Sequence, residues 1–233
     1  MKLRFLTLLL VFVLSSSFTN SFTSIKTAVY VGNSAEDDII SLYETFVNQN
    51  ATMPQLVSFS NAVKGYSKLK SEGKIANETL TIIDFSLSSR AKRLWVLDMT
   101  SHKVLFNTVV AHGRNTGGEF ATKFSNTNNS NQSSLGFYIT DNTYYGKNGL
   151  SLFLDGQEKG INDNARKRYV VFHGAKYANP DFAKRQGRLG RSLGCPAVPT
   201  AFNTAIIKTI KNKSCLFIYH PNKNYQETSR LIG

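Results

Sequence analysis

The sequence predicts an α+β fold, in which an N-terminal helical pair precedes a mainly β region. Between residues 34 and 72, apolar residues recur at the spacing of amphipathic helices. From residue 79 onward the chain changes to short runs of β-branched and aromatic residues, separated by turn-like gaps. The 233 residues are enough for one domain with a sizeable core.

Residues 1–24 have the features of a secretory signal peptide. Lys2 and Arg4 give a short positive segment, residues 6–14 are almost entirely apolar, and Ser and Thr residues follow. No later stretch approaches the roughly 18 apolar residues of a membrane-spanning helix. We therefore expect an exported chain, in the periplasm or cell envelope, with no stable membrane span after cleavage.

Residues 25–78 form the predicted helical region. The stretch that begins at Ser34 resembles a capping box, Pro54 can open a second helix, and Gly73 can end it. The expected apolar stripes are Ile39, Tyr43, Phe46 and Val47 in the first helix, and Leu56, Phe59, Val63, Tyr66 and Leu69 in the second.

The β-rich region covers residues 79–233. A polar tract, FSNTNNSNQSSL, precedes a short strand that contains GFYI, and long loops inside a β region more often serve a site than act as linkers. We expect further strands at 79–84, 93–98, 103–110, 168–173 and 216–220, and a helix at 200–211.

The net charge of +13 restricts the class of partner. A basic exported protein meets acidic polymers such as cell-wall carboxylates, phosphate polymers and anionic headgroups. Nucleic acid would fit the charge alone, but export argues against it and no groove-reading motif is present. We therefore expect no nucleic-acid partner.

The two cysteines lie in different settings. Cys215 opens an alternating apolar run, where it is expected to pack in a core strand. Cys195 stands between Gly194 and Pro196, where no regular element can run, so its thiol is expected to be displayed. A disulfide between the two cysteines is possible but not required in a protein of this size.

His173 closes an apolar strand and is the candidate base for Cys195. A free thiol is mostly protonated at neutral pH; a neighbouring imidazole can take its proton, and a nearby cation such as Arg191 can favour the thiolate. A backbone carbonyl such as that of Gly174 can fix the imidazole tautomer. A lone histidine in this position is more often structural, so the prediction that His173 is a base depends on its pairing with Cys195.

The turn before Cys195 is rich in glycine. Gly190 and Gly194 flank Arg191, Ser192 and Leu193, and such a turn lets backbone N–H groups converge as an oxyanion hole requires. An ordinary tight loop is the alternative.

Other cysteine and histidine chemistries fit less well. In a papain-like peptidase the cysteine precedes the histidine, whereas here His173 precedes Cys195. Four histidines and two cysteines show none of the spacings that hold zinc, so we expect no metal and no cofactor.

The order His173-Gly174, a basic insertion, and Ser192-Leu193-Gly194-Cys195 resembles the signature of the L,D-transpeptidases of bacterial cell walls. The resemblance implies that residues 79–233 form an L,D-transpeptidase-like catalytic domain, a mainly β sandwich. Over roughly residues 79–221, further segments resemble one branch of that family: DFS (84–86), HG (112–113), FSN (124–126), SSLGFY (133–138), YYGKNG (144–149) and NDNARKR (162–168).

The resemblance also implies the chemistry. Cys195 would be the nucleophile and His173 the base, with the Gly174 carbonyl orienting the imidazole and with Ser192 and Gly194 shaping the turn and the oxyanion site. The thiolate would attack the amide between a diamino acid and D-alanine in a peptidoglycan tetrapeptide stem. An amine would resolve the thioester into a 3–3 crosslink or an exchanged terminal D-amino acid.

Two alternatives stay open. Water as the acceptor would make the chain an L,D-carboxypeptidase. A non-catalytic basic protein that binds the cell wall through a relic site would fit the charge and the export equally well.

The chain departs from the commonest family pattern after Ser192. Leu193 replaces a second histidine that many members carry, and proline and alanine follow Cys195 where many have arginine or asparagine. His173 is then the only base in the motif. We also place Arg191, His112 and Tyr145 among the expected substrate-binding residues, although a structural role for His112 is as plausible.

Overall fold

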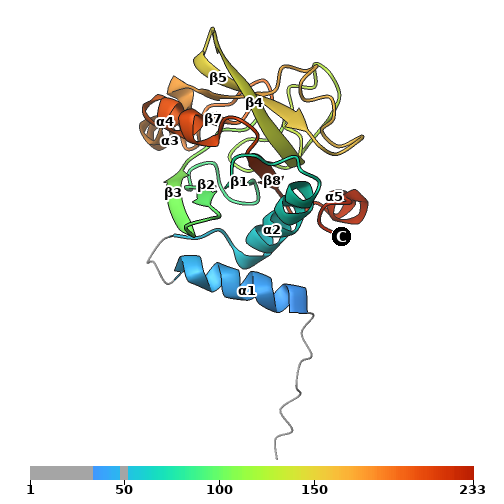
Figure 1. Cartoon of the computed structure of the whole chain (residues 1–233). Helices are drawn as coiled ribbons and strands as arrows, with labels where there is room; N and C mark the ends of the chain where they lie inside the picture. Colours follow the sequence, from blue (N-terminus) through green and yellow to red (C-terminus); the bar gives the residue numbers. More distant parts are fainter. Residues whose placement is uncertain (1–33, 48–51) are drawn as a thin grey trace, which may run out of the picture. The chain divides into compact units, whose positions relative to one another are not determined.

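The structure is a computed structural model that describes residues 34–47 and 52–233. The predicted signal peptide, residues 1–24, lies outside the described residues. The helices are α1 (Ser34–Val47), α2 (Leu56–Ser71), α3 (Pro180–Gln186), α4 (Thr200–Ile210) and α5 (Lys223–Thr228), with a 3-10 helix η1 at Lys176–Ala178 (Figure 1). The strands are β1 (Thr79–Asp84), β2 (Leu94–Asp98), β3 (Lys103–Thr108), β4 (Gly136–Gly146), β5 (Gly149–Gly156), β6 (Val171–Gly174), β7 (Ala197–Val198) and β8 (Cys215–Tyr219).

The eight strands form one hydrogen-bonded sheet in the order β3-β2-β1-β8-β4-β5-β6-β7. β1 and β8 run parallel, as do β6 and β7 at one edge, and the other neighbours are antiparallel. The predicted class, a mainly β region preceded by a helical pair, is confirmed. The strands expected to form a sandwich join edge to edge in this single sheet.

The helical pair shares the core of the sheet. α2 packs against β1 and β8, with Phe59, Tyr66 and Leu69 buried. Tyr43 and Phe46 of α1 contact the Phe59 ring edge-on, with ring centroids 5.1 and 5.9 Å away. Burial of these aromatic rings is what fixes α1 to α2, since apolar burial contributes about 25 cal/mol per Å².

Two residues of the predicted apolar stripes lie at helix ends and are exposed. Val47 and Leu56, expected to be buried, are 42% and 41% exposed, and each lies at an end of its helix. The predicted stop at Gly73 is confirmed: its φ is +69°, and the N–H of Lys74 reaches back to the carbonyl of Leu69.

Several elements were missed from the sequence, namely β5, β7, α3 and α5. The strand expected from residue 168 begins instead at Val171, because the preceding segment is held in turns and Tyr169 has a φ of +53°. Cys215 is buried on β8, as predicted, and both cysteines are free thiols.

Within residues 34–47 and 52–233, no helix combines the length and the apolarity needed to cross a bilayer. The same residues contain no group of His, Cys, Asp and Glu side chains arranged to hold a metal ion.

Candidate active site

The parallel pair β6 and β7 brings the two candidate catalytic segments side by side. His173 pairs with Ala197 and Gly174 with Val198, so the same register sets Cys195 beside Val171. The Val171 N–H donates to the Cys195 sulfur over 3.5 Å, and the sulfur lies 3.6 Å from the Tyr169 carbonyl. His173 and Cys195 are 22 residues apart in the sequence, and they therefore lie on adjacent, paired segments of the fold.

The imidazole of His173 has one nitrogen engaged and one available. The residue is 3% exposed, and Nδ1 donates to the carbonyl of Gly174 over 3.0 Å. This bond leaves the proton on Nδ1 and the lone pair on Nε2, which has no hydrogen-bond partner in the described chain and none to Cys195. Burial lowers the pKa of His173, and the hydrogen bond to the Gly174 carbonyl raises it by less, so the net shift is downward from 6.5. The ring is therefore neutral at neutral pH.

The thiol of Cys195 is also held in its neutral form. Burial raises its pKa, while the Val171 N–H and the charge of Arg168 act in the opposite direction and are outweighed. The residue keeps partial solvent exposure. At neutral pH the two groups are therefore a thiol and a neutral imidazole.

The turn before Cys195 is fixed by Ser192. Its hydroxyl donates to the Cys195 carbonyl over 2.7 Å and accepts from the Gly194 N–H over 3.0 Å. Gly194 has a φ of +129°, and a Cβ there would lie 2.8 Å from the Gln132 carbonyl. Both residues thus shape the turn, and the N–H of Cys195 makes no hydrogen bond to another backbone group of the described chain.

The polar tract is hydrogen-bonded to this turn. The Ser133 hydroxyl donates to the Gly194 carbonyl over 2.9 Å and accepts from the Gly113 N–H over 3.1 Å. Arg168 donates to the carbonyls of Ser125 and Gln132 over 2.8 and 2.7 Å. The tract is therefore hydrogen-bonded to the turn that carries Cys195.

Arg168, not Arg191, is the cation whose charge acts on the Cys195 thiol. Arg191 is exposed, and its Nη1 donates to the carbonyls of Arg114 and Gly117, each over 3.1 Å. Sequence reasoning missed the role of Arg168, although the residue ends the NDNARKR segment, which was noted only for its family resemblance.

His112 lies behind the turn, 1% exposed. Its Nδ1 accepts from the buried guanidinium of Arg93 over 2.8 Å, and Nε2 faces the Gly117 carbonyl at 3.4 Å. Burial, followed by the charge of Arg93, lowers its pKa to about 4. Both ring nitrogens are engaged within the protein, and the His112 carbonyl accepts the Ser192 N–H over 2.9 Å, which favours the structural role.

Tyr145 lies at the tip of the β4–β5 hairpin, 83% exposed. In the strand register, Tyr144 pairs with Ser151 and Ser151 pairs with His173, so these three share one face of the sheet and Tyr145 belongs to the other. The Tyr144 ring stacks on Phe153 with centroids 4.7 Å apart. Tyr144 is therefore the tyrosine on the same side as His173.

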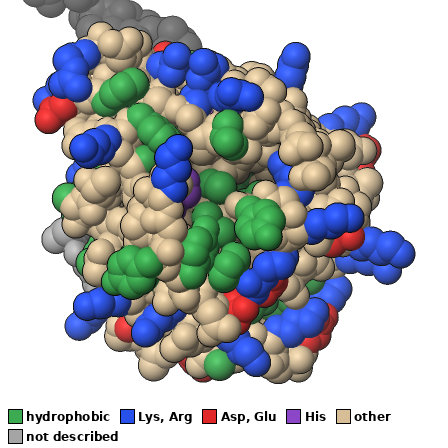
Figure 2. Space-filling model, turned by 90° about the horizontal axis from the view of Figure 1, so that it is seen from above, with side chains coloured by type: hydrophobic (Ala, Val, Ile, Leu, Met, Phe, Trp, Pro, Cys, Tyr) green, Lys and Arg blue, Asp and Glu red, His purple; other side chains and the backbone are tan. Residues whose placement is uncertain are grey.

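Figure 2 shows one face of the molecule, where a histidine is visible in a depression bordered by hydrophobic side chains, with Lys and Arg around it. Neither of the two described hollows is lined by Cys195 or His173.

Comparisons with known proteins identify the family of the chain. Residues 49–219, more than half of the chain, match the family model of the L,D-transpeptidase catalytic domain. A search of curated proteins finds no match.

Among solved structures, an L,D-transpeptidase from Mycobacterium smegmatis is 12% identical with a TM-score of 0.39, over 61% of this chain and 59% of that chain. The helical cell shape determining protein Pgp2 from Campylobacter jejuni is 11% identical with a TM-score of 0.41, over 73% and 58%. An L,D-transpeptidase from Stackebrandtia nassauensis is 13% identical with a TM-score of 0.37, over 71% and 67%. The chain thus spans somewhat less than two thirds of the first two structures.

Proposed function

Because the chain belongs to the L,D-transpeptidase catalytic domain family, we propose that it is a cysteine acyltransferase that acts on peptidoglycan tetrapeptide stems. One observation carries the assignment of residues. Cys195 and His173 lie on paired segments, and the Gly174 carbonyl holds the imidazole with Nε2 unbonded.

In the first half-reaction, Nε2 of His173 takes the proton from the Cys195 thiol as the sulfur attacks the carbonyl carbon of the third stem residue. The tetrahedral oxyanion accepts the N–H of Cys195. The C–N bond to the terminal D-alanine then breaks, and the imidazolium returns its proton to the leaving amine. The product is a thioester at Cys195.

In the second half-reaction, the side-chain amine of another stem attacks the thioester. His173 accepts a proton from the attacking amine and returns it to the departing sulfur, so the neutral pair is restored. The new amide is a 3–3 crosslink, whereas a D-amino acid as acceptor exchanges the terminal residue.

We further propose that the protein is exported to the cell envelope. The charge order and apolar run of residues 1–24, together with the high net charge, support export toward an acidic polymer. The described helices include none able to span a bilayer.

Product analysis tests the function. Purified protein is incubated with tetrapeptide muropeptides, and the products are identified by mass, with Cys195→Ala as the control. Release of D-alanine together with dimers supports transpeptidation, and release without dimers assigns a carboxypeptidase. No release, and no acylation of Cys195 by a carbapenem, would identify a non-catalytic wall-binding protein.

A further inference from the structure

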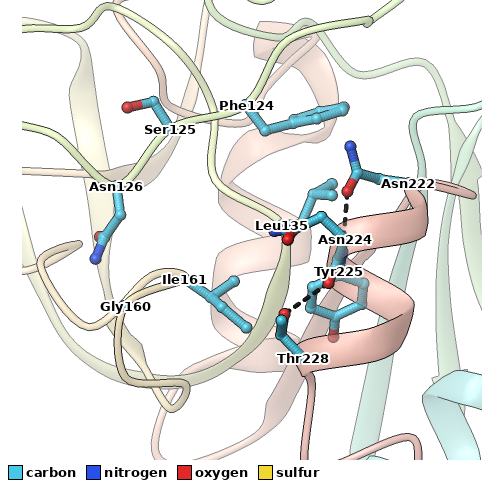
Figure 3. A pocket seen from close by; sticks show the side chains of 10 residues that line it. All are labelled: Phe124, Ser125, Asn126, Leu135, Gly160, Ile161, Asn222, Asn224, Tyr225 and Thr228. Carbon is cyan, nitrogen blue, oxygen red and sulfur yellow. Dashed lines mark hydrogen bonds between the residues drawn. The ribbon is translucent and has the colours of Figure 1, made fainter.

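One of the two hollows lies beside α5, away from Cys195 and His173, between that helix and the start of the polar tract (Figure 3). Its volume is about 240 Å³, and none of the side chains that line it is charged. A charge-free wall is notable in a chain with 28 Lys and Arg residues, and it selects a neutral ligand.

The walls keep hydrogen-bonding groups available. The side-chain amide of Asn224 bonds to nothing else in the described chain, and the Asn222 amide uses only its oxygen, which accepts the Tyr225 N–H over 2.9 Å. The Ser125 hydroxyl accepts from the Thr127 N–H over 3.0 Å and retains its own proton. Donors and acceptors of this kind match hydroxyl and acetamido groups.

The remaining surface of the hollow is apolar. The Phe124 ring lies at its edge in Figure 3 and is partly exposed. Its centroid is 4.9 Å from that of the His220 ring. Ile161 lies across from it. An aromatic and aliphatic surface beside a few fixed polar groups suits a ligand with one apolar face and several hydroxyls, which describes a sugar ring.

The hollow is coupled to the nucleophile through Arg168. One nitrogen of its guanidinium donates to the Ser125 carbonyl at the hollow, and the other donates to the Gln132 carbonyl, against which Gly194 packs. Arg168 therefore links Ser125, which lines the hollow, to Gln132, which lies against the turn that carries Cys195.

We infer that this hollow binds an N-acetylated hexosamine of the glycan strand that carries the stem. The inference rests on the proposed function, and it adds the neutral sugar as a second element of recognition. The charged stem would then occupy the side of Cys195, and the uncharged glycan the side of α5.

Binding of a sugar without a stem tests the site independently of catalysis. Chitotetraose is titrated into purified protein and followed by amide chemical shifts. Thr228 also lines the hollow. We expect shifts confined to the hollow and an affinity about tenfold lower in Asn224→Ala combined with Thr228→Val, as for one or two lost hydrogen bonds. Gln226→Ala, on the same helix but outside the lining, is the matched control. Absence of shifts in the hollow, or an unchanged affinity in the double variant, would overturn the inference.

Turnover separates the two proposals. We expect kcat/KM for a disaccharide-tetrapeptide to exceed that for the free tetrapeptide, and the ratio to fall toward one in Asn224→Ala. Equal values in the unmodified protein would reject the sugar site and leave the acyltransferase intact. Turnover of neither substrate would reject the acyltransferase, and chitotetraose binding would then decide the sugar site alone.

Discussion

The main-chain N–H of Val171 donates to the sulfur of Cys195 over 3.5 Å, two residues before His173 on the same strand. β6 therefore supports both members of the proposed pair. A backbone donor cannot rotate away, so it opposes the burial that raises the thiol pKa and holds the sulfur in one place.

Replacement of Cys195 separates chemistry from packing. Cys195→Ala should abolish acylation by a carbapenem while lowering the melting temperature by only a few degrees, about 2–4 °C. Cys215→Ala removes a wholly buried sulfur from β8 and should leave acylation intact. It should lower the free energy of unfolding by roughly 1–3 kcal/mol, and its melting temperature should fall further than that of Cys195→Ala. Acylation that survives in Cys195→Ala would contradict the assignment, as would a larger stability loss there than in Cys215→Ala.

The pH dependence follows from the neutral pair. His173 must be unprotonated to act as a base, and burial lowers its pKa below the ordinary 6.5, so kcat/KM should fall only as the pH drops below that value. The thiol pKa is raised above the ordinary 9.0, so iodoacetamide alkylation should increase with pH through a midpoint above 9.0. An alkylation midpoint on the acid side of that value would indicate a preformed thiolate–imidazolium pair instead.

Arg168 should tune the thiol where Arg191 does not. Arg168→Gln removes the charge that lowers the Cys195 pKa, so alkylation at fixed pH should slow by about three- to tenfold. Arg168→Lys keeps the charge and should recover most of that rate even if the loop contacts weaken. Arg191→Gln is the matched control, with an unchanged thiol titration; a shifted titration there and none in Arg168→Gln would reverse the assignment.

Gly194 should tolerate no side chain. Its φ of +129° and the 2.8 Å separation between the Gln132 carbonyl and the position that a Cβ would take together cost about 1–3 kcal/mol in Gly194→Ala. Displacement of the turn should also lower the acylation rate. Expressed as free energies, the rise in the activation barrier should be at least as large as the loss of folding stability. Gly187→Ala, also at positive φ but with open space around it, should keep the acylation rate, and an equal loss in both variants would show that the effect is not local to the turn.

The candidate pair could be predicted from the sequence, whereas its supports could not. Two local sequence patterns identify the pair: Cys195 stands between two turn-forming residues, and His173 ends an apolar strand. The effect of Arg168 on the thiol depends on a fold that brings residue 168 against Gly194, and no periodicity encodes that contact. The interior position of His112 likewise depends on the buried side chain of Arg93.

Tyr145, one of the expected substrate-binding residues, lies on the sheet face opposite to His173. The β4–β5 register shifts between Thr140 and Thr143, so the alternation that starts at the GFYI segment does not continue unchanged to the hairpin tip. This shift arises from the strand pairing and is not visible in the sequence pattern.

Trapping the acyl-enzyme tests the central claim most directly. Protein mixed with a disaccharide-tetrapeptide is quenched in acid at short times, digested, and mapped by mass spectrometry. We expect an adduct on Cys195 that equals the substrate less D-alanine, and a rate of formation about 10²- to 10⁴-fold lower in His173→Ala. No adduct, an adduct on another residue, or an undiminished rate in His173→Ala would contradict the pairing of Cys195 with His173.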